Sequence, residues 1–214
     1  MTIDDHIVFV VDDDVRVREA LTELLDSHGI RAVAYGSAGE YVQAEKPDLS
    51  ASVIVLDVEL PDINGLELQK QIADGNHPPI VFITGHGDIP SSVRAIKHGA
   101  VDFLTKPFSD DDLMKAIQVG LMQDRQARVE RAEMAALRVR YAALTPRERD
   151  VLPLVVSGLL NKQAAAELRI SEVTLQIHRR NVMQKMAAAS LADLVRMAEK
   201  LQIPVTHSRR TGEA

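Results

Sequence analysis

Five short apolar runs, each followed by a longer amphipathic segment, dominate the first half of this 214-residue chain. The runs are rich in β-branched residues and show no polar alternation, which is typical of strands buried on both faces of a parallel sheet. They occupy residues 7–12, 31–35, 52–57, 79–84 and 101–105. We therefore expect a doubly wound α/β domain of five parallel strands with helices on both faces.

Glycines close three of the amphipathic segments. Gly29, Gly75 and Gly99 each follow the last apolar residue of a helical pattern. Glycine is common just past a helix because it adopts the left-handed backbone conformation without strain. The three positions are therefore predicted helix ends, as an alternation of strands and helices requires.

Cysteine and long apolar stretches are both absent from the sequence. The lack of cysteine excludes disulfides, thiol catalysis and cysteine-ligated zinc. No apolar run approaches the ~20 residues that cross a bilayer, and the first residues lack the basic segment of a signal peptide. We expect a cytoplasmic protein without a membrane segment.

The formal net charge of −6 conceals a division along the chain. Residues 1–122 carry a net charge of −12, whereas residues 123–214 carry +6. An acidic half joined to a basic half indicates two domains with different partners. The predicted parts are a first domain at 1–122, a helical linker at 123–143, a second domain at 144–204 and a flexible tail at 205–214.

Polar side chains stand at the ends of four of the apolar runs. Asp12 and Asp13 lie at the end of the first run, and Asp57 ends the third. Thr84 ends the fourth run, and Lys106 follows the fifth. Ligands of doubly wound sheets bind beyond these strand ends, and crowded carboxylates with only oxygen donors favour Mg²⁺. A carboxylate nucleophile beside Mg²⁺, a lysine and a hydroxyl can form an aspartyl-phosphate.

Asp14 admits a second interpretation. A carboxylate after a strand often caps the helix that follows, and that role fits Asp14 as well as membership of the site does. The same interpretation does not account for Asp12, Asp13 and Asp57 together, because three acids at one sheet edge repel one another.

The segments VVDDD, VLDVELPDINGLEL, ITGHGD and DFLTKPF resemble the receiver domain of two-component response regulators, especially the FixJ type. The resemblance covers residues 6 to about 122. It implies that Asp57 accepts the phosphoryl group and that Asp12 and Asp13 form the acidic pair. It also implies a Mg²⁺ site made by these acids, in which Asp13, Asp57 and the backbone carbonyl of Glu59 bind the ion directly.

The same resemblance assigns roles to three further residues. Thr84 and Phe103 would be the pair that changes conformation on phosphorylation, and Lys106 would contact the phosphate. Phe103 can also be interpreted as a simple core residue. The family further implies a sensor histidine kinase as the phosphoryl donor.

A long helix is predicted to leave the first domain. The segment begins at Ser109 with acids in its first turn, and Leu113, Ile117 and Leu121 recur at helical spacing. The apolar stripe then thins toward Leu137. A coiled coil and a solvated helix both stay open as interpretations, because apolar heptads are not sustained.

Residues beyond Leu144 follow the pattern of four short helices. Thr145 and Pro146 are typical of a helix start, Gly158 of a helix end, and Ser190 of the start of the last helix. A tight turn at 170–171 separates the second helix from the third. This arrangement predicts a helix-turn-helix unit.

The third of these helices has an apolar side at Leu175, Val182 and Met186, which should be core. Its other side is polar and basic, as suits a recognition helix in a major groove. The predicted DNA contacts are Lys162, Thr174, Gln176, Ile177, Arg179, Arg180 and Lys185. Lys162, Thr174, Arg179 and Lys185 are expected at phosphates, which set affinity rather than sequence preference.

The segments LTPRE, GLLNK and QKM resemble the LuxR-type DNA-binding domain over roughly residues 140–204. Three positions depart from that family: Pro153 inside the first helix, Arg169 at a turn glycine, and Gln176 where lysine is common. The resemblance implies that the last helix, 190–201, forms a dimer surface on DNA. Some of its apolar residues, Leu191, Leu194, Val195 and Ala198, must instead be core.

The combined prediction is a transcription factor switched by phosphorylation of Asp57, which dimerises and binds DNA, with RNA polymerase as a further candidate partner. Two alternatives belong to other classes. An aspartyl-phosphate phosphatase of the haloacid dehalogenase type needs a second Asp where Glu59 stands, and a cap domain for which the chain has no room. A constitutive DNA-binding protein with a degenerate receiver conflicts with the intact acid, threonine and lysine set.

Overall fold

The computed structural model describes residues 6–45, 51–73, 76–86 and 89–204. Two sequence predictions, the helix end at Gly75 and the flexible tail at 205–214, lie outside these described residues. Within them, no helix combines the length and the apolar character needed to cross a membrane.

The chain forms two compact units, Met1–Val129 and Glu130–Ala214. The division falls inside helix α5, which runs without a break from Asp110 to Ala142. The predicted long helix is therefore present. Each unit has its own hydrophobic core.

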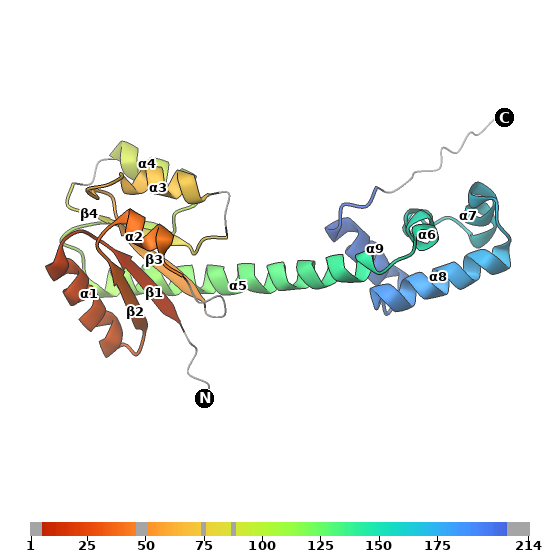
Figure 1. The fold of residues 1–214 in the computed structure, drawn as a ribbon, viewed down its shortest axis with the longest axis horizontal. Coiled ribbons are helices and arrows are strands. Elements are labelled where there is room, and N and C mark those ends of the chain that lie inside the picture. Colours follow the sequence, from red (N-terminus) through yellow and green to blue (C-terminus); the bar gives the residue numbers. More distant parts are fainter. Residues whose placement is uncertain (1–5, 46–50, 74–75, 87–88, 205–214) are drawn as a thin grey trace. The chain divides into compact units, whose positions relative to one another are not determined.

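A five-stranded parallel sheet with the order β2-β1-β3-β4-β5 forms the centre of the first unit (Figure 1). Its strands are β1 (Ile7–Val11), β2 (Arg31–Tyr35), β3 (Ser52–Asp57), β4 (Ile80–Thr84) and β5 (Asp102–Thr105). The predicted doubly wound α/β fold is confirmed, and the predicted strand limits agree to within one residue.

Helices cover both faces of this sheet because neighbouring residues of a buried strand point to opposite sides. Ile7, Phe9 and Val11 enter one core, and Val8 and Val10 enter the other. The first core is covered by α2 (Ala38–Gln43), α3 (Gly65–Ile72) and α4 (Ile89–Lys97), and the second by α1 (Val15–Ser27) and α5.

The register of the strands brings the polar strand ends to one edge. Val11 of β1 pairs with Leu56 of β3, so the residues that follow, Asp12 and Asp57, are neighbours. Asp57 pairs in turn with Ile83 of β4, which precedes Thr84. The strand order reverses between β1 and β3, the place where doubly wound sheets bind ligands.

Two of the predicted helix ends are glycines in the left-handed conformation. Gly29 follows α1 with φ +69°, and Gly99 follows α4 with φ +89°. Both values lie where other residues are strained. The sequence prediction of these ends is confirmed.

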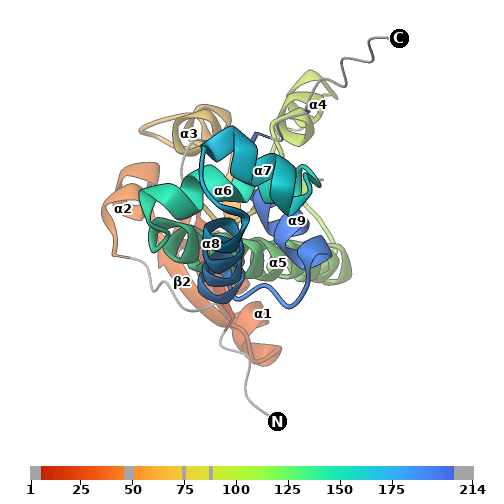
Figure 2. The same cartoon turned by 90° about the vertical axis from the view of Figure 1, so that its right-hand side faces the viewer.

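The second unit contains four short helices besides the end of α5, as predicted. They are α6 (Pro146–Val156), α7 (Asn161–Leu168), α8 (Glu172–Met186) and α9 (Leu191–Lys200). Helix α8 packs against α6 and α7, and α9 packs against α6 and α8 (Figure 2). Leu152, Leu175 and Val182 are among the fully buried residues of their single core.

Local interactions fix the ends of these helices. Thr145 and Glu148 form a reciprocal capping box at the start of α6, and this helix continues past Pro153. Arg169 ends α7 in the left-handed conformation, with φ 54° and ψ 47°, at the turn before α8. The departure from glycine at this turn therefore preserves the backbone conformation that glycine favours.

Candidate metal centre and candidate nucleic-acid interface

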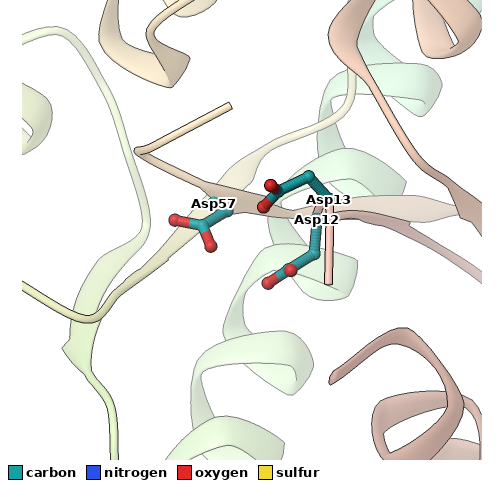
Figure 3. Close-up of side chains that lie close together, drawn as sticks. All are labelled: Asp12, Asp13 and Asp57. Carbon is teal, nitrogen blue, oxygen red and sulfur yellow. The ribbon is translucent and has the colours of Figure 1, made fainter. Parts of the chain in front are cut away.

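Three carboxylates gather at the carboxyl edge of the sheet (Figure 3). Asp12, Asp13 and Asp57 each offer one oxygen, and these oxygens lie within 4.8 Å of one another. Asp12 and Asp57 are buried, with 0% and 6% of their surface exposed, whereas Asp13 is exposed. Negative charges this close and this poorly solvated need compensation by a cation.

Lys106 supplies one such positive charge. Its Nζ atom donates to Asp12 Oδ2 at 2.6 Å and to Asp57 Oδ2 at 2.7 Å. Burial lowers the pKa of Lys106, but its bonds to the two carboxylates outweigh burial and hold that pKa above its ordinary value. Burial also raises the pKa of Asp12, although Lys106 opposes that change. The ion pair thus keeps Lys106 and Asp12 in position at the carboxyl edge of the sheet.

Backbone amides orient the buried carboxylates. The amide of Asp14 donates to Asp12 Oδ1 at 2.9 Å, and the amide of Glu59 donates to Asp57 Oδ1 at 3.0 Å. The side chain of Asp14 itself accepts from the amide of Arg16 and caps α1. Of the two interpretations of Asp14, the structure therefore supports the helix cap.

The donor set of the cluster fits Mg²⁺. It consists only of carboxylate oxygens, which suit this hard cation better than zinc. The part of the chain that the structure describes contains no other group of three or more histidines and acids close enough to hold a metal ion. Asp13 leaves the cluster open to solvent on one side, so an ion can reach it. The side chain of Glu59 is exposed and lies 3.4 Å from His86 Nδ1.

Thr84 and Phe103, the predicted conformational pair, lie on the neighbouring strands β4 and β5. Thr84 is fully buried, and its hydroxyl accepts from the amide of His86 at 3.2 Å and donates to the His86 carbonyl at 3.3 Å. Phe103 is partly buried, and its ring centre lies 6.1 Å from that of Phe82. Core packing and a switching role are both compatible with this position.

Asp62 holds the loop beside the cluster in place and was not predicted. It accepts hydrogen bonds from the amides of Ala38 and Gly39, at 3.3 and 2.8 Å, in the first turn of α2. Burial raises the pKa of Asp62, but hydrogen bonds from backbone amides, those of Gly39 and Ala38 foremost, together outweigh burial and lower this pKa. Its place after Pro61 in a turn was the available signal, since such acids often bond to backbone amides.

Asp124 makes a second unpredicted contact, at the opposite edge of the sheet. It is 2% exposed, and its Oδ2 accepts from the Ser52 amide at 2.8 Å and from Arg128 Nε at 2.6 Å. Ser52 is the first residue of β3, and Asp124 lies in α5. Because the residues are 72 positions apart in sequence, no local pattern could reveal the pairing.

Helix α8 has the two sides that the sequence predicted. Leu175, Val182 and Met186 are fully buried, which confirms the predicted core side. Gln176, Ile177 and Arg180, three of the predicted DNA contacts, are exposed. Lys162, on α7, is also exposed.

Three predicted phosphate contacts have partners within the second unit. Lys185 Nζ lies 2.7 Å from the buried Glu148 carboxylate, and Arg179 Nη1 donates to Asn161 at 3.0 Å. The Thr174 hydroxyl lies 2.8 Å from that of Ser171. Their predicted DNA roles require these side chains to bind phosphate in addition to, or in place of, the present partners.

Helix α9 uses part of its apolar stripe within its own unit. Leu194 and Ala198 are buried, with 0% and 1% of their surface exposed, and belong to the core. Leu191 is 37% exposed and Val195 is partly buried. The expectation that some of these residues are core is therefore confirmed.

Two known families match successive parts of the chain. Residues 8–118 match the response regulator receiver domain, and residues 142–198 match the luxR family of bacterial regulatory proteins. The first match alone spans more than half of the chain. This chain belongs to the response regulators. The acidic cluster lies in its receiver domain, and α8 lies in its LuxR-type domain.

Several proteins resemble this response regulator over nearly its whole length. Nodulation protein W of Bradyrhizobium diazoefficiens is 50% identical, over 96% of this chain and 90% of its own. The transcriptional regulatory protein FixJ of Azorhizobium caulinodans is 47% identical, over 89% of this chain and 90% of its own. The solved structure of the response regulator StyR is 45% identical, covers 92% of this chain and 99% of its own, and has a TM-score of 0.81.

Family membership favours the leading prediction over the phosphatase alternative. Glu59 stands where a dehalogenase-type phosphatase needs aspartate, and the second half of the chain matches a family of regulatory proteins. The contacts of Lys106 with Asp12 and Asp57 also argue against the alternative of a degenerate receiver.

Proposed function

We propose that this response regulator is a transcription factor controlled by a phosphoryl group on Asp57. A sensor histidine kinase donates the group, and the receiver catalyses only its own phosphorylation and dephosphorylation. The observation that carries the proposal is the contact of Asp57 with Lys106 inside the acidic cluster. Carboxylate, ammonium and a metal-binding acid pair are the groups that phosphoryl transfer to an aspartate needs.

Asp57 acts as the nucleophile. One of its carboxylate oxygens bonds to phosphorus while the bond from phosphorus to the kinase histidine nitrogen breaks, and the imidazole leaves with the electron pair. Asp12, Asp13, Asp57 and the Glu59 carbonyl would hold Mg²⁺, which would supply positive charge for the phosphoryl oxygens. Lys106 exchanges one of its carboxylate contacts for a phosphoryl oxygen.

The conformational response begins at Thr84. Its hydroxyl turns to donate to a phosphoryl oxygen, which replaces its two long hydrogen bonds to His86. Phe103 then turns into the space that Thr84 leaves. The charge on the phosphoryl group thereby causes the side chains around β5 to pack differently at its outer surface.

Phosphorylated copies form a homodimer through the face made by α4, β5 and α5. Helix α4 exposes Ile89, Val93 and Ile96, with 79%, 44% and 47% of their surfaces accessible. The spacing of these residues places them on one side of the helix. A contiguous exposed apolar patch of this kind supports a role in protein association.

The dimer presents two α8 helices to successive major grooves of DNA, in half-sites about one helical turn, ~34–36 Å, apart. Gln176, Ile177 and Arg180 read the bases, and Lys162, Thr174, Arg179 and Lys185 contact phosphates. The functional divisions we propose are the receiver at 1–122, linker at 123–143, DNA-binding domain at 144–204 and tail at 205–214. Because the protein acts on DNA, we expect it in the cytoplasm. RNA polymerase is a further proposed partner.

Selection of bound DNA with and without acetyl phosphate tests the proposal. Phosphorylation should enrich sequences with two related half-sites at a fixed spacing. Equal enrichment without acetyl phosphate, or recovery of no preferred sequence, contradicts it.

The Arg180→Gln variant tests the proposed interface on the selected DNA. Arg180 is exposed on α8, and loss of one base contact of about 1–3 kcal/mol weakens binding about 5- to 150-fold. Arg147→Gln is the matched control, because Arg147 is exposed on α6, outside α8 and outside the predicted dimer surface on α9. Equal affinity of the two variants in fluorescence anisotropy would refute the placement of α8 in the groove.

A further inference from the structure

The outward side of α5 carries a short apolar stripe. Val119, Met122 and Val129 expose 41%, 64% and 49% of their surfaces. The other side of the same helix is already buried against the sheet, at Leu113 and Ile117 among others. These side chains lie outside the receiver core, and apolar residues that line up on the solvent side of a helix favour a contact with another surface.

These exposed residues follow a heptad pattern. Val119 and Gln126 occupy successive a positions, and Met122 and Val129 occupy the d positions between and after them. The steps of three, four and three residues keep all four on one line along the helix. The ten steps of about 1.5 Å from Val119 to Val129 make this line about 15 Å long.

We propose that these four residues, here named the α5 seam, pack against the α5 seam of a second copy in a parallel, in-register arrangement. Charge complementarity identifies the second copy as the occupant. Arg125 lies at a g position of the heptad, and Glu130 lies at the next e position. In a parallel pair of helices, each g residue lies beside the following e residue of the other copy, so Arg125 would face Glu130. An antiparallel pair would instead bring Arg125 beside Arg125.

The polar residue of the α5 seam supports the in-register arrangement. Gln126 at a bonds best to the same amide of a second copy, and a single polar a residue favours one register at a cost in stability. Arg125, Gln126 and Glu130 also have partners within their own chain, so pairing across copies adds to those contacts or replaces them.

The α5 seam ends after Glu130. The next a residue, Glu133, has an ion pair with Lys200 at 3.0 Å, and two such acids facing each other would repel. Fewer than two heptads cannot hold two copies together alone. The inference therefore rests on the proposed phosphorylation-dependent dimer, which raises the effective concentration of one seam near the other.

Disulfide trapping in the full-length chain tests the α5 seam. The protein has no cysteine, so Met122→Cys and Val129→Cys each introduce the single thiol of the chain. Copper-phenanthroline and oxygen oxidise two thiols to a disulfide only where the Cα atoms approach within about 7 Å. Val42→Cys is the matched control, since Val42 is 54% exposed on α2, which covers the other face of the sheet.

With acetyl phosphate and Mg²⁺, both seam variants should cross-link several-fold more than Val42→Cys. Cross-linking at both positions requires parallel helices, because an antiparallel pair brings at most one of them opposite itself. Ultracentrifugation of the same samples separates the outcomes. A phosphorylated dimer whose seam variants cross-link no more than the control overturns the α5 seam and leaves the proposed function intact. Absence of the dimer overturns the seam and the dimerisation step together.

A substitution supplies a second measurement. Met122→Glu places like charges across the α5 seam, so the phosphorylated dimer should weaken several-fold while labelling of Asp57 is unchanged. An unchanged dimer affinity would overturn the inference.

Discussion

Replacing Glu148 with glutamine should destabilise the second unit by about 2 kcal/mol. Glu148 is 2% exposed, and its Oε2 accepts from Lys185 Nζ at 2.7 Å and from the Thr145 amide at 2.8 Å. Glutamine has the same shape and keeps one acceptor oxygen. The free energy of unfolding therefore falls by the contribution of one hydrogen bond to a charged group, about 1.5–3 kcal/mol. The value stays below that of a fully buried pair because Lys185 is 35% exposed and regains water.

The pH dependence of this loss has a definite sign. Burial raises the pKa of Glu148, but Lys185 and Thr145 outweigh burial and hold that pKa below its ordinary value. A folded-state pKa below the unfolded one stabilises the protein above about pH 4.3 and ceases to do so as pH falls through the folded-state value. The difference between the wild type and Glu148→Gln should therefore shrink as the pH falls below about 4.

Hydrogen exchange of the α6 and α8 amides measures this effect within the full chain. If the free energy of opening falls by about 2 kcal/mol, amides that exchange through this opening should exchange roughly 30-fold faster. Asp150→Asn is the matched control on the same helix, because its pair with Arg147 is 3.4 Å long and exposed. That variant should change the opening free energy by less than about 0.5 kcal/mol. Equal exchange in the two variants would refute the assignment of Glu148 as a buried ionic anchor.

Two further changes affect the receiver. Gly65→Ala should destabilise the first unit by about 1–3 kcal/mol in thermal unfolding, because a Cβ there would overlap the carbonyl oxygen of Asp57. Gly36→Ala, whose Cβ would meet other atoms at 3.6 Å, is its control, and equal melting temperatures would contradict the close packing of α3 on β3. Chelation of Mg²⁺ should abolish labelling of Asp57 by acetyl phosphate, and added Mg²⁺ should restore it. Undiminished labelling in the presence of the chelator would show that Asp57 is phosphorylated without a metal ion.

Local sequence patterns were sufficient to predict the receiver fold and the residues of its sheet edge. Buried parallel strands need continuous apolar runs, and the fold brings their carboxyl ends together whatever the intervening helices contain. Asp12, Asp57 and Lys106 could therefore be grouped although up to 94 positions separate them. The same reasoning identified Leu175, Val182 and Met186 as core, since helical spacing is a local property.

Contacts between side chains on different elements were not predictable in this way. Lys185 was expected only at DNA phosphates, yet it pairs with Glu148 of another helix. Asp124 was not singled out, although it bonds to the first residue of β3. A lysine or an aspartate on a helix has the same local pattern whether it faces water or a buried partner. Only the packing of the helices distinguishes these cases.

Stoichiometric labelling of Asp57 with a parallel measurement of DNA affinity tests the central claim most directly. The full chain is incubated with acetyl phosphate and Mg²⁺, and intact mass, peptide mapping and fluorescence anisotropy on the selected DNA are recorded. The account predicts one phosphoryl group per chain, located on Asp57, and a clear rise in affinity that Asp57→Asn lacks. Full labelling without any change in assembly or DNA affinity would contradict it, as would labelling of another residue in the wild-type protein.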